Sequence, residues 1–111
     1  LAETLGAIEG RHGALTAGAD PMVSGCAALG ALRVMLTGGD AAEVATLVEG
    51  LREDVRPHGG AVVVQAAHTA LRAQVDPWGP VDAGALRLMK ALKDEFDPTR
   101  VLNPGRFVGG L

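Results

Sequence analysis

The chain has little cysteine, aromatic character or net charge. Its 111 residues include one cysteine, two phenylalanines, one tryptophan and no tyrosine, and the formal charge is −3. A lone cysteine cannot form an intrachain disulfide, which favours a reducing compartment, the cytoplasm. The weak negative charge gives no broad electrostatic reason to bind nucleic acid or an anionic membrane, so neither is expected as a partner. With so few aromatic residues, Ala, Val and Leu are left to form the core.

The chain also lacks a hydrophobic run long enough to span a membrane. Its most apolar stretch, residues 22–36, contains Arg33 and two glycines and is shorter than the roughly 20 residues that a spanning helix needs. It opens on Leu-Ala-Glu, without an initiator methionine and without the basic and apolar regions of a signal peptide. We therefore expect residues 1–111 to form one domain that is part of a longer protein.

The first third of the sequence is typical of one helix followed by two strands. Apolar side chains recur at helical intervals over residues 1–12, which predicts a short amphipathic helix. A strand is expected over 22–28. Over 31–37 apolar and polar residues alternate, as in a strand with one buried face, and Leu29-Gly30 is expected to turn the two strands into a hairpin.

A strand, helix, strand unit is predicted next. Asp40 and Glu43 form a D-x-x-E capping box at the start of the helix, and Pro57 ends it. The β-branched run 61–66 is typical of a strand buried on both faces, and a crossover of this kind places its two strands parallel or near each other in one sheet. The expected buried positions are Val44, Leu47, Val48, Leu51 and Val55, and the expected solvent-facing ones are Glu43, Glu49, Arg52, Glu53 and Arg56.

A second capped helix is predicted from Asp82 to the Asp97-Pro98 pair. Residues 68–75 before it are irregular in pattern, and 76–80 are rich in turn residues and predict a loop. After the helix, Pro104-Gly105 suits the centre of a type II turn. The apolar stripe of the helix, expected to face the core, consists of Ala85, Leu88, Met89, Leu92 and Phe96.

The histidines and the cysteine do not form a recognisable metal site. His12, His58 and His68 lie far apart in the sequence, and Cys26 has no second thiol. We expect structural histidines, with His58 near the carbonyls at a helix end, and a buried, inert Cys26.

The charged residues near the end of the second helix suggest a structural rather than a catalytic role. Three carboxylates and two cations follow one another there, which predicts a solvated charge cluster rather than a general-acid pair. They are Asp94, Glu95, Asp97, Lys93 and Arg100.

Trp78, the sole tryptophan, lies in a loop between two prolines. A large aromatic side chain in such a place either caps an internal apolar patch or contacts a partner surface, and both interpretations remain open.

The end of the sequence resembles a known family. The resemblance rests on Trp78-Gly79-Pro80, on Leu92-Lys93 followed by Phe96-Asp97-Pro98, and on Leu102-Asn103-Pro104-Gly105-Arg106-Phe107. These strings are similar to the C-terminus of FAD-linked oxidases of the vanillyl-alcohol-oxidase type, closest to the FAD-binding subunits of glycolate oxidases. The resemblance implies an α+β, ferredoxin-like cap domain over residues 1–111, with a small, mostly antiparallel sheet covered by helices.

The resemblance also implies a function. Such a cap covers the flavin ring and forms the substrate side, while an N-terminal FAD-binding domain of the same chain holds most of the cofactor. The implied reaction is oxidation of a 2-hydroxy acid such as glycolate, with electrons leaving through a second flavoprotein subunit and an iron-sulfur subunit. The enzyme would be cytoplasmic or peripheral to the inner membrane. The isolated chain is expected to be inactive, to bind FAD weakly and to self-associate.

Asn103 and Arg106 are the candidate cofactor-binding residues. An amide both donates and accepts hydrogen bonds, and a guanidinium offers a planar fork of donors. In the competing interpretation Asn103 only braces its turn and Arg106 pairs with a nearby carboxylate. Related 2-hydroxy-acid dehydrogenases carry metal-binding histidines and a Glu-His-Gly stretch, whereas this chain has Pro57-His58-Gly59, so no metal ligand and no catalytic residue is predicted.

The alternative function is a non-catalytic α+β interaction or ligand-sensing module. It is favoured by the lack of a nucleophile and base pair or of a metal constellation in the sequence. A module of this kind would be complete at this length, whereas a cap requires a flavin domain before it.

Overall fold

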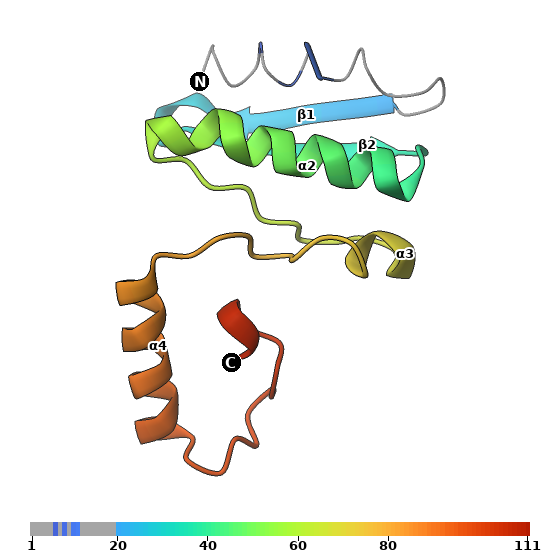
Figure 1. Ribbon diagram of the computed structural model, residues 1–111. Coiled ribbons are helices and arrows are strands. Elements are labelled where there is room, and N and C mark those ends of the chain that lie inside the picture. The colour runs from blue at the N-terminus through green and yellow to red at the C-terminus, as the bar shows by residue number, and fades with distance from the viewer. Residues whose placement is uncertain (1–5, 7, 9, 12–19) are drawn as a thin grey trace.

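The structure is a computed structural model that describes residues 6, 8, 10, 11 and 20–111. From residue 20 on, it begins with an antiparallel hairpin. Strand β1 (Asp20–Cys26) pairs with β2 (Ala31–Thr37), with Met22 opposite Met35 (Figure 1). The short helix η1 (Ala27–Leu29) and Gly30, with φ of 62°, connect them. The two strands and the turn predicted for this hairpin are confirmed, although β1 begins and ends two residues earlier than expected.

Helix α2 (Ala41–Val55) packs against the inner face of the hairpin. Asp40 caps it as predicted, because its side chain accepts a hydrogen bond of 2.8 Å from the backbone N–H of Ala42. The alternation in β2 is also confirmed: Leu32, Val34 and Leu36 are half-buried and their neighbours exposed. Two groups of buried residues form the core on α2, namely Val44, Val48, Leu71 and Val75, and Ile8, Leu47 and Leu51.

The N-terminal helix prediction is only partly within the described residues. Residues 6, 8, 10 and 11 are helical, and the rest of the predicted segment, including His12, lies outside the described residues. Arg11 forms a forked ion pair with Asp54 of α2, with atoms 2.6 and 2.9 Å apart. The guanidinium lies over Gly50, where any side chain would collide with it. The ion pair and the burial of Ile8 tie this segment to α2.

The strand predicted over residues 61–66 is wrong. These residues run extended beneath α2 after η2 (Arg56–His58), but in the described structure they pair with neither β1 nor β2. Their polar groups have other partners: the Val62 carbonyl accepts from Arg52 at 3.3 Å, and the Val64 N–H donates to the Pro77 carbonyl at 2.8 Å. The apolar side chains of Val62 and Val64 still pack into the core, so the run is hydrophobic for burial rather than for sheet pairing.

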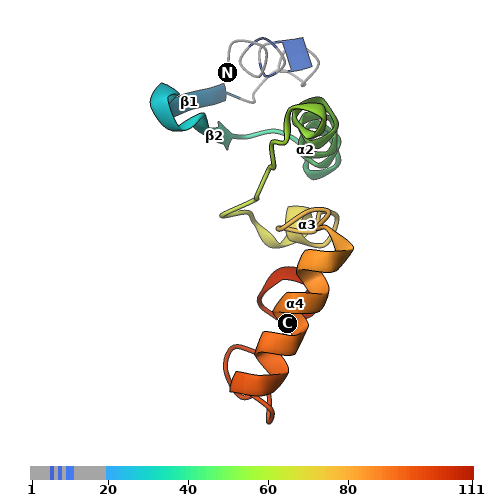
Figure 2. The same ribbon diagram turned by 90° about the vertical axis from the view of Figure 1, so that its left-hand side faces the viewer.

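The chain after Val75 forms a separate part around helix α4 (Ala83–Phe96). Asp82 caps α4 as predicted, accepting from the Ala85 N–H at 2.9 Å. A short helix α3 (Thr69–Arg72) precedes it within the stretch expected to be irregular, and η3 (Val108–Gly110) closes the chain. Figures 1 and 2 both show α4 well apart from the hairpin and α2, with α3 between them.

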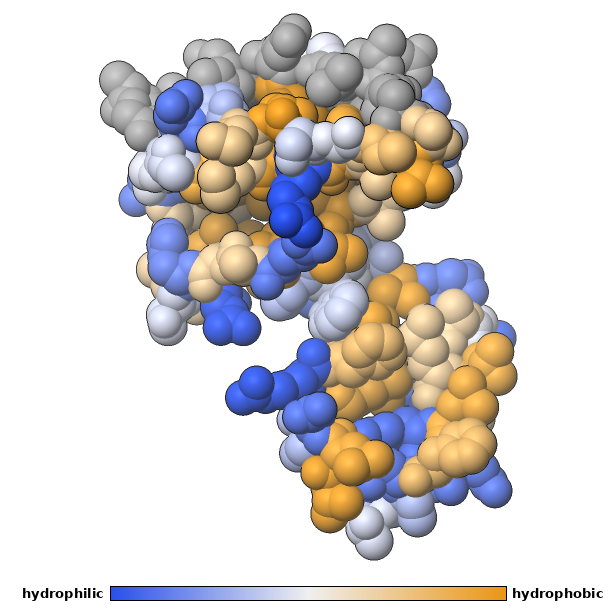
Figure 3. Space-filling view, turned by 180° about the vertical axis from the view of Figure 1, so that it is seen from behind, coloured by the Kyte–Doolittle hydropathy of each residue, from blue (hydrophilic) through white to orange (hydrophobic). Residues whose placement is uncertain are grey.

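The apolar stripe of α4 is not buried as expected. Leu88, Leu92 and Phe96 are 63%, 50% and 79% exposed, while Ala85 and Met89 are half-buried. The C-terminal segment packs against a residue outside the stripe, because Leu86 lies directly against Gly109. Leu88, Leu92 and Phe96 remain in solvent, and apolar side chains reach the surface on this part of the molecule as well as on the other (Figure 3).

The separation of the two parts makes the molecule extended. Its radius of gyration is 15.9 Å and its extents are 47 × 32 × 21 Å, whereas a compact domain of this length has a radius of gyration of about 13 Å. A small antiparallel sheet with helices confirms the predicted α+β class. No helix among the described residues is long and apolar enough to cross a bilayer.

Candidate functional site

Asp97 organises the loop that follows α4. Its carboxylate is 4% exposed, binds the Lys93 ammonium at 2.6 Å and accepts from the backbone N–H groups of Val101 and Leu102, both at 3.0 Å. Lys93 also donates to the Leu102 carbonyl at 2.7 Å. We call Lys93, Asp97, Val101 and Leu102 the Asp97 clamp, and it fixes where residues 103–107 begin.

The contacts in the clamp lower the pKa of Asp97. The hydrogen bond from Lys93 lowers the pKa of Asp97, the two backbone N–H groups add to this effect, and desolvation opposes it. The cluster predicted at this helix end therefore exists, with a second ion pair of 2.6 Å between Arg100 and Asp94. It is not wholly solvated, because Asp97 is buried while Asp94 is exposed.

The turn held by the clamp presents both predicted cofactor-binding residues. The Arg106 N–H donates to the Asn103 carbonyl at 3.3 Å, and Gly105 has φ of 73°, as expected for the predicted type II turn. Asn103 itself has φ of 46°, a conformation that asparagine tolerates better than most residues. The backbone conformation alone therefore favours asparagine at this position, which agrees with the interpretation that Asn103 braces its turn. Both side chains are exposed, and within the described part of the chain Arg106 forms no ion pair.

Trp78 packs against Phe107 of the C-terminal segment. Its ring meets Phe107 edge to face, with centroids 5.1 Å apart and planes at 68°. Its backbone N–H donates to the Asp76 side chain at 3.0 Å, which shapes the loop. Trp78 therefore contacts an aromatic ring of its own chain. Because Phe107 is 50% exposed, the pair also leaves area for a second molecule, and both interpretations of Trp78 stay open.

A hollow of about 620 Å³ separates the Trp78 loop from the C-terminal turn. Trp78 and Phe107 form its aromatic wall, and the backbone of Gly105, Gly109 and Gly110 forms much of the rest. Two arginines, Arg72 and Arg106, also line it, with Asp76 as the acidic residue among its lining residues. The sequence predicted Arg106 and missed Arg72, which the pattern of α3 does not distinguish from an ordinary surface cation.

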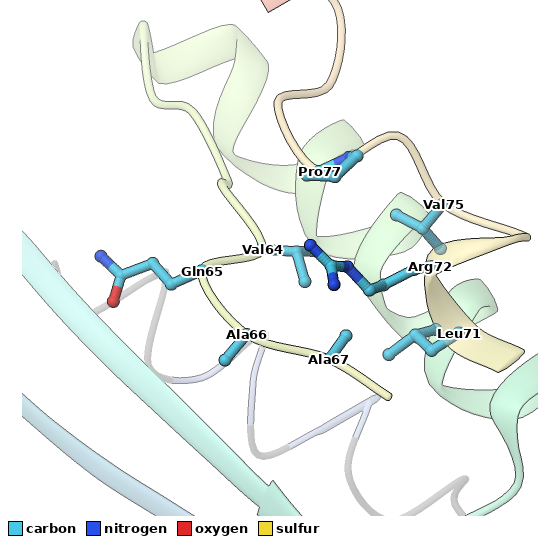
Figure 4. A pocket seen from close by; sticks show the side chains of 8 residues that line it. All are labelled: Val64, Gln65, Ala66, Ala67, Leu71, Arg72, Val75 and Pro77. Atoms are coloured by element: carbon cyan, nitrogen blue, oxygen red, sulfur yellow. The ribbon is translucent and has the colours of Figure 1, made fainter. Parts of the chain in front are cut away.

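A second cavity is too small for a substrate. It holds about 30 Å³ between α3 and the extended segment, enough for about one water molecule. Figure 4 shows its apolar walls, including Val64, Leu71 and Pro77, and the Arg72 side chain extending from α3 toward Val64. This cavity marks incomplete packing rather than a site.

Arg52 supports the Trp78 loop from α2, contrary to its predicted place in solvent. It is 7% exposed and donates to the Asp76 carbonyl at 2.6 Å, while its ion pair with Glu49 measures 2.7 Å. Gly79 lies against the guanidinium so closely that a Cβ would come within 2.7 Å of Nε. An arginine at the edge of a helical pattern gives no sign of this role, because the backbone carbonyls that it binds belong to a distant segment.

The remaining predicted residues lie outside the hollow. Cys26 is exposed at the end of β1 rather than buried, as is every other residue of β1 except Pro21. His58 ends η2 directly after α2, where it was expected, and His68 precedes α3. The described residues contain no group of three His, Cys, Asp or Glu side chains that could hold a metal ion.

The comparisons with known proteins point to the same segment. Residues 77–107 match the family of FAD linked oxidases, C-terminal domain, and the match supports the family suggested by the resemblance. It begins at the Trp78 loop and includes α4, the Asp97 clamp and the 103–106 turn. Searches of curated proteins and of solved structures find no significant match.

Proposed function

We propose that the chain is the substrate-side cap of an FAD-dependent enzyme that oxidises a 2-hydroxy acid such as glycolate. The observation that carries the proposal is the match of residues 77–107 to the C-terminal domain of FAD-linked oxidases. The geometry supports it, because that segment ends in a hydrogen-bonded turn whose Asn103 and Arg106 side chains are exposed. In this proposal an N-terminal FAD-binding domain lies against the turn.

Asn103 and Arg106 are the residues proposed to contact the flavin side of the site. The Asp97 clamp and the type II turn hold them on one short segment, and their side chains are exposed and available. An amide and a guanidinium suit the carbonyl and nitrogen atoms of a flavin ring, so the residues present fit the cofactor. The turn offers too few contacts to hold FAD alone, and most of the binding is assigned to the preceding domain.

The chemistry divides between cofactor and protein. Bound FAD supplies the hydride acceptor for the carbinol carbon of the substrate. The residues of this chain orient the reactants and cover them, which excludes water from the reacting atoms. A second flavoprotein subunit and an iron-sulfur subunit would accept the electrons, an arrangement that would place the enzyme in the cytoplasm or at the inner membrane surface.

The test uses the longer flavoprotein that the proposal requires. Purified under anaerobic conditions, it should contain flavin whose visible absorption bleaches when glycolate is added. Arg106→Gln should slow the bleaching or weaken flavin retention, whereas Arg87→Gln, an exposed control on α4, should do neither. A colourless protein would contradict the proposal and favour an interaction or ligand-sensing module. A coloured protein that no 2-hydroxy acid bleaches would contradict the substrate class alone.

A further inference from the structure

The hollow beside Trp78 has the chemistry of an anion site. Arg72 from α3 and Arg106 from the C-terminal turn both line it, and they are 34 positions apart in the sequence. Neither guanidinium forms an ion pair or a side-chain hydrogen bond within the part of the chain that is described. Arg11, Arg52 and Arg100 differ, because each already binds a carboxylate.

The carboxylate in the lining does not cancel this charge. Asp76 lies in the hollow but makes no ion pair with Arg72, and one of its oxygens accepts the Trp78 N–H at 3.0 Å. Two cations and one anion leave a net positive concave surface. A concave wall concentrates the field of its charges, so the hollow attracts anions more strongly than a flat surface with the same residues.

The walls of the hollow indicate the rest of the ligand. Its volume of about 620 Å³ far exceeds a bare phosphate or carboxylate group and suits a small organic molecule. Trp78 and Phe107 supply apolar area on one side, and Gly105 and Gly110 leave open space where side chains would otherwise stand. A guanidinium fork matches two oxygens of a carboxylate or a phosphate group.

We infer that this hollow binds an organic oxyanion, with Arg72 and Arg106 holding the charged head and Trp78 and Phe107 contacting an apolar body. The inference adds Arg72 to the site and does not rest on the proposed flavin contacts, because the hollow is built from this chain alone. The shared chemistry of the ligand is an oxyanion head, which either a carboxylate or a phosphate monoester provides.

The sole tryptophan makes the inference testable on the 111-residue chain. Trp78 lines the hollow, so its fluorescence reports occupancy directly. The probes are benzoate and phenyl phosphate, which share an aromatic body and differ in their heads, and benzyl alcohol, which has the body without a charge. We expect saturable fluorescence changes with one or both anions and none with benzyl alcohol, and the anion that binds more tightly identifies the head group.

Variants separate binding at the site from general charge effects. Arg72→Gln and Arg106→Gln should each weaken binding about tenfold, the usual effect of losing one charge-assisted hydrogen bond. Arg33→Gln makes the same change of charge on the exposed face of β2 and should leave the titration unchanged. No saturable change with either anion, or equal affinity in Arg72→Gln and wild type, would overturn the inference. Either result would leave the flavin proposal standing, since that proposal is tested by absorption of the longer protein.

Discussion

Asp97 is the residue on which the geometry of the C-terminal loop depends. Replacing it with asparagine keeps one acceptor oxygen but sets an NH2 group against a donor, either Lys93 or a backbone N–H. We expect Asp97→Asn to lower the thermal midpoint measured by circular dichroism. Asp94→Asn, which breaks only the exposed pair with Arg100, should change it little. Equal effects of the two variants would show that the buried clamp does not stabilise the chain.

The clamp also predicts a dependence on pH. Because the pKa of Asp97 is lowered on folding, the group contributes stability above its unfolded pKa of about 3.9 and loses it as the pH falls through the folded value. Urea unfolding of wild type and Asp97→Asn should therefore differ most near neutral pH and converge at acid pH. A difference that stays constant down to pH 2, about two units below the unfolded pKa, would contradict the assignment.

Substitutions at Gly79 and Gly105 distinguish the cost of backbone strain from the cost of a steric clash. Gly79 and Gly105 have φ of 72° and 73°, so alanine at either costs about 1–2 kcal/mol of backbone strain. At Gly105 a Cβ would meet open space, whereas at Gly79 it would strike the Arg52 guanidinium. We expect Gly79→Ala to lose more free energy of unfolding than Gly105→Ala. The reverse order in urea titrations would mean that Arg52 is not packed over Gly79.

Local chemistry was predictable at the scale of residues, and distant partners were not. The caps at Asp40 and Asp82 and the turn at Pro104-Gly105 follow from residues only a few positions apart. The role of Arg52 was missed because it binds the carbonyl of Asp76, 24 positions away. The place of Arg72 in the hollow was missed because the opposite wall comes from the C-terminal segment. Cys26 was placed wrongly because its small neighbours suggest burial, whereas β1 is largely exposed.

Helix α4 shows how far hydrophobic periodicity can be taken at the scale of elements. The pattern correctly predicts the helix, but it cannot say what covers its stripe, and Leu88, Leu92 and Phe96 stay exposed. Residues 61–66 show that the composition of a segment likewise does not determine whether it pairs as a strand. Their β-branched run has the composition of a central strand, yet Arg52 and Pro77 satisfy polar groups that a neighbouring strand would otherwise bind.

The exposed edge of α4 predicts self-association of the isolated chain. Leu88, Leu92 and Phe96 repeat every four residues and are at least half exposed, which forms an apolar face along the helix. We expect sedimentation velocity to show association that grows with concentration and weakens in Leu92→Gln. The same change should alter the free energy of unfolding by about 0.5 kcal/mol or less, as for other surface positions. A strictly monomeric wild type would contradict this expectation.

At the scale of the whole molecule, Arg52 joins the two parts. It connects α2 to the Asp76 carbonyl, and its loss would leave that carbonyl and Glu49 without their charged donor. We expect Arg52→Met to cost about 2–3 kcal/mol of unfolding free energy, measured in urea. Arg56→Met, an exposed control near the end of the same helix, should cost about 0.5 kcal/mol or less. Similar costs would mean that the two parts do not depend on this contact.

The two-part shape is consistent with a chain whose C-terminal part is completed by another domain. The hairpin and α2 share a core, while α4 and the C-terminal turn leave apolar and polar groups uncovered. Sequence patterns favoured a cap through the resemblance of the last segment. They could not show which apolar groups stay uncovered, because that depends on how far α4 lies from the first core. Large apolar side chains are exposed on both parts, including Met22 and Leu29 of the hairpin and Leu88 and Phe96 of α4.

Amide hydrogen exchange of residues 101–107 tests the central claim most directly. The backbone N–H groups of this segment would be compared between the 111-residue chain and the longer flavin-containing protein that the proposal requires. If another domain covers the turn, exchange of this segment should slow by about tenfold or more in the longer protein. Equal exchange rates in the two proteins would show that nothing docks there and would contradict the assignment of this chain as a cap.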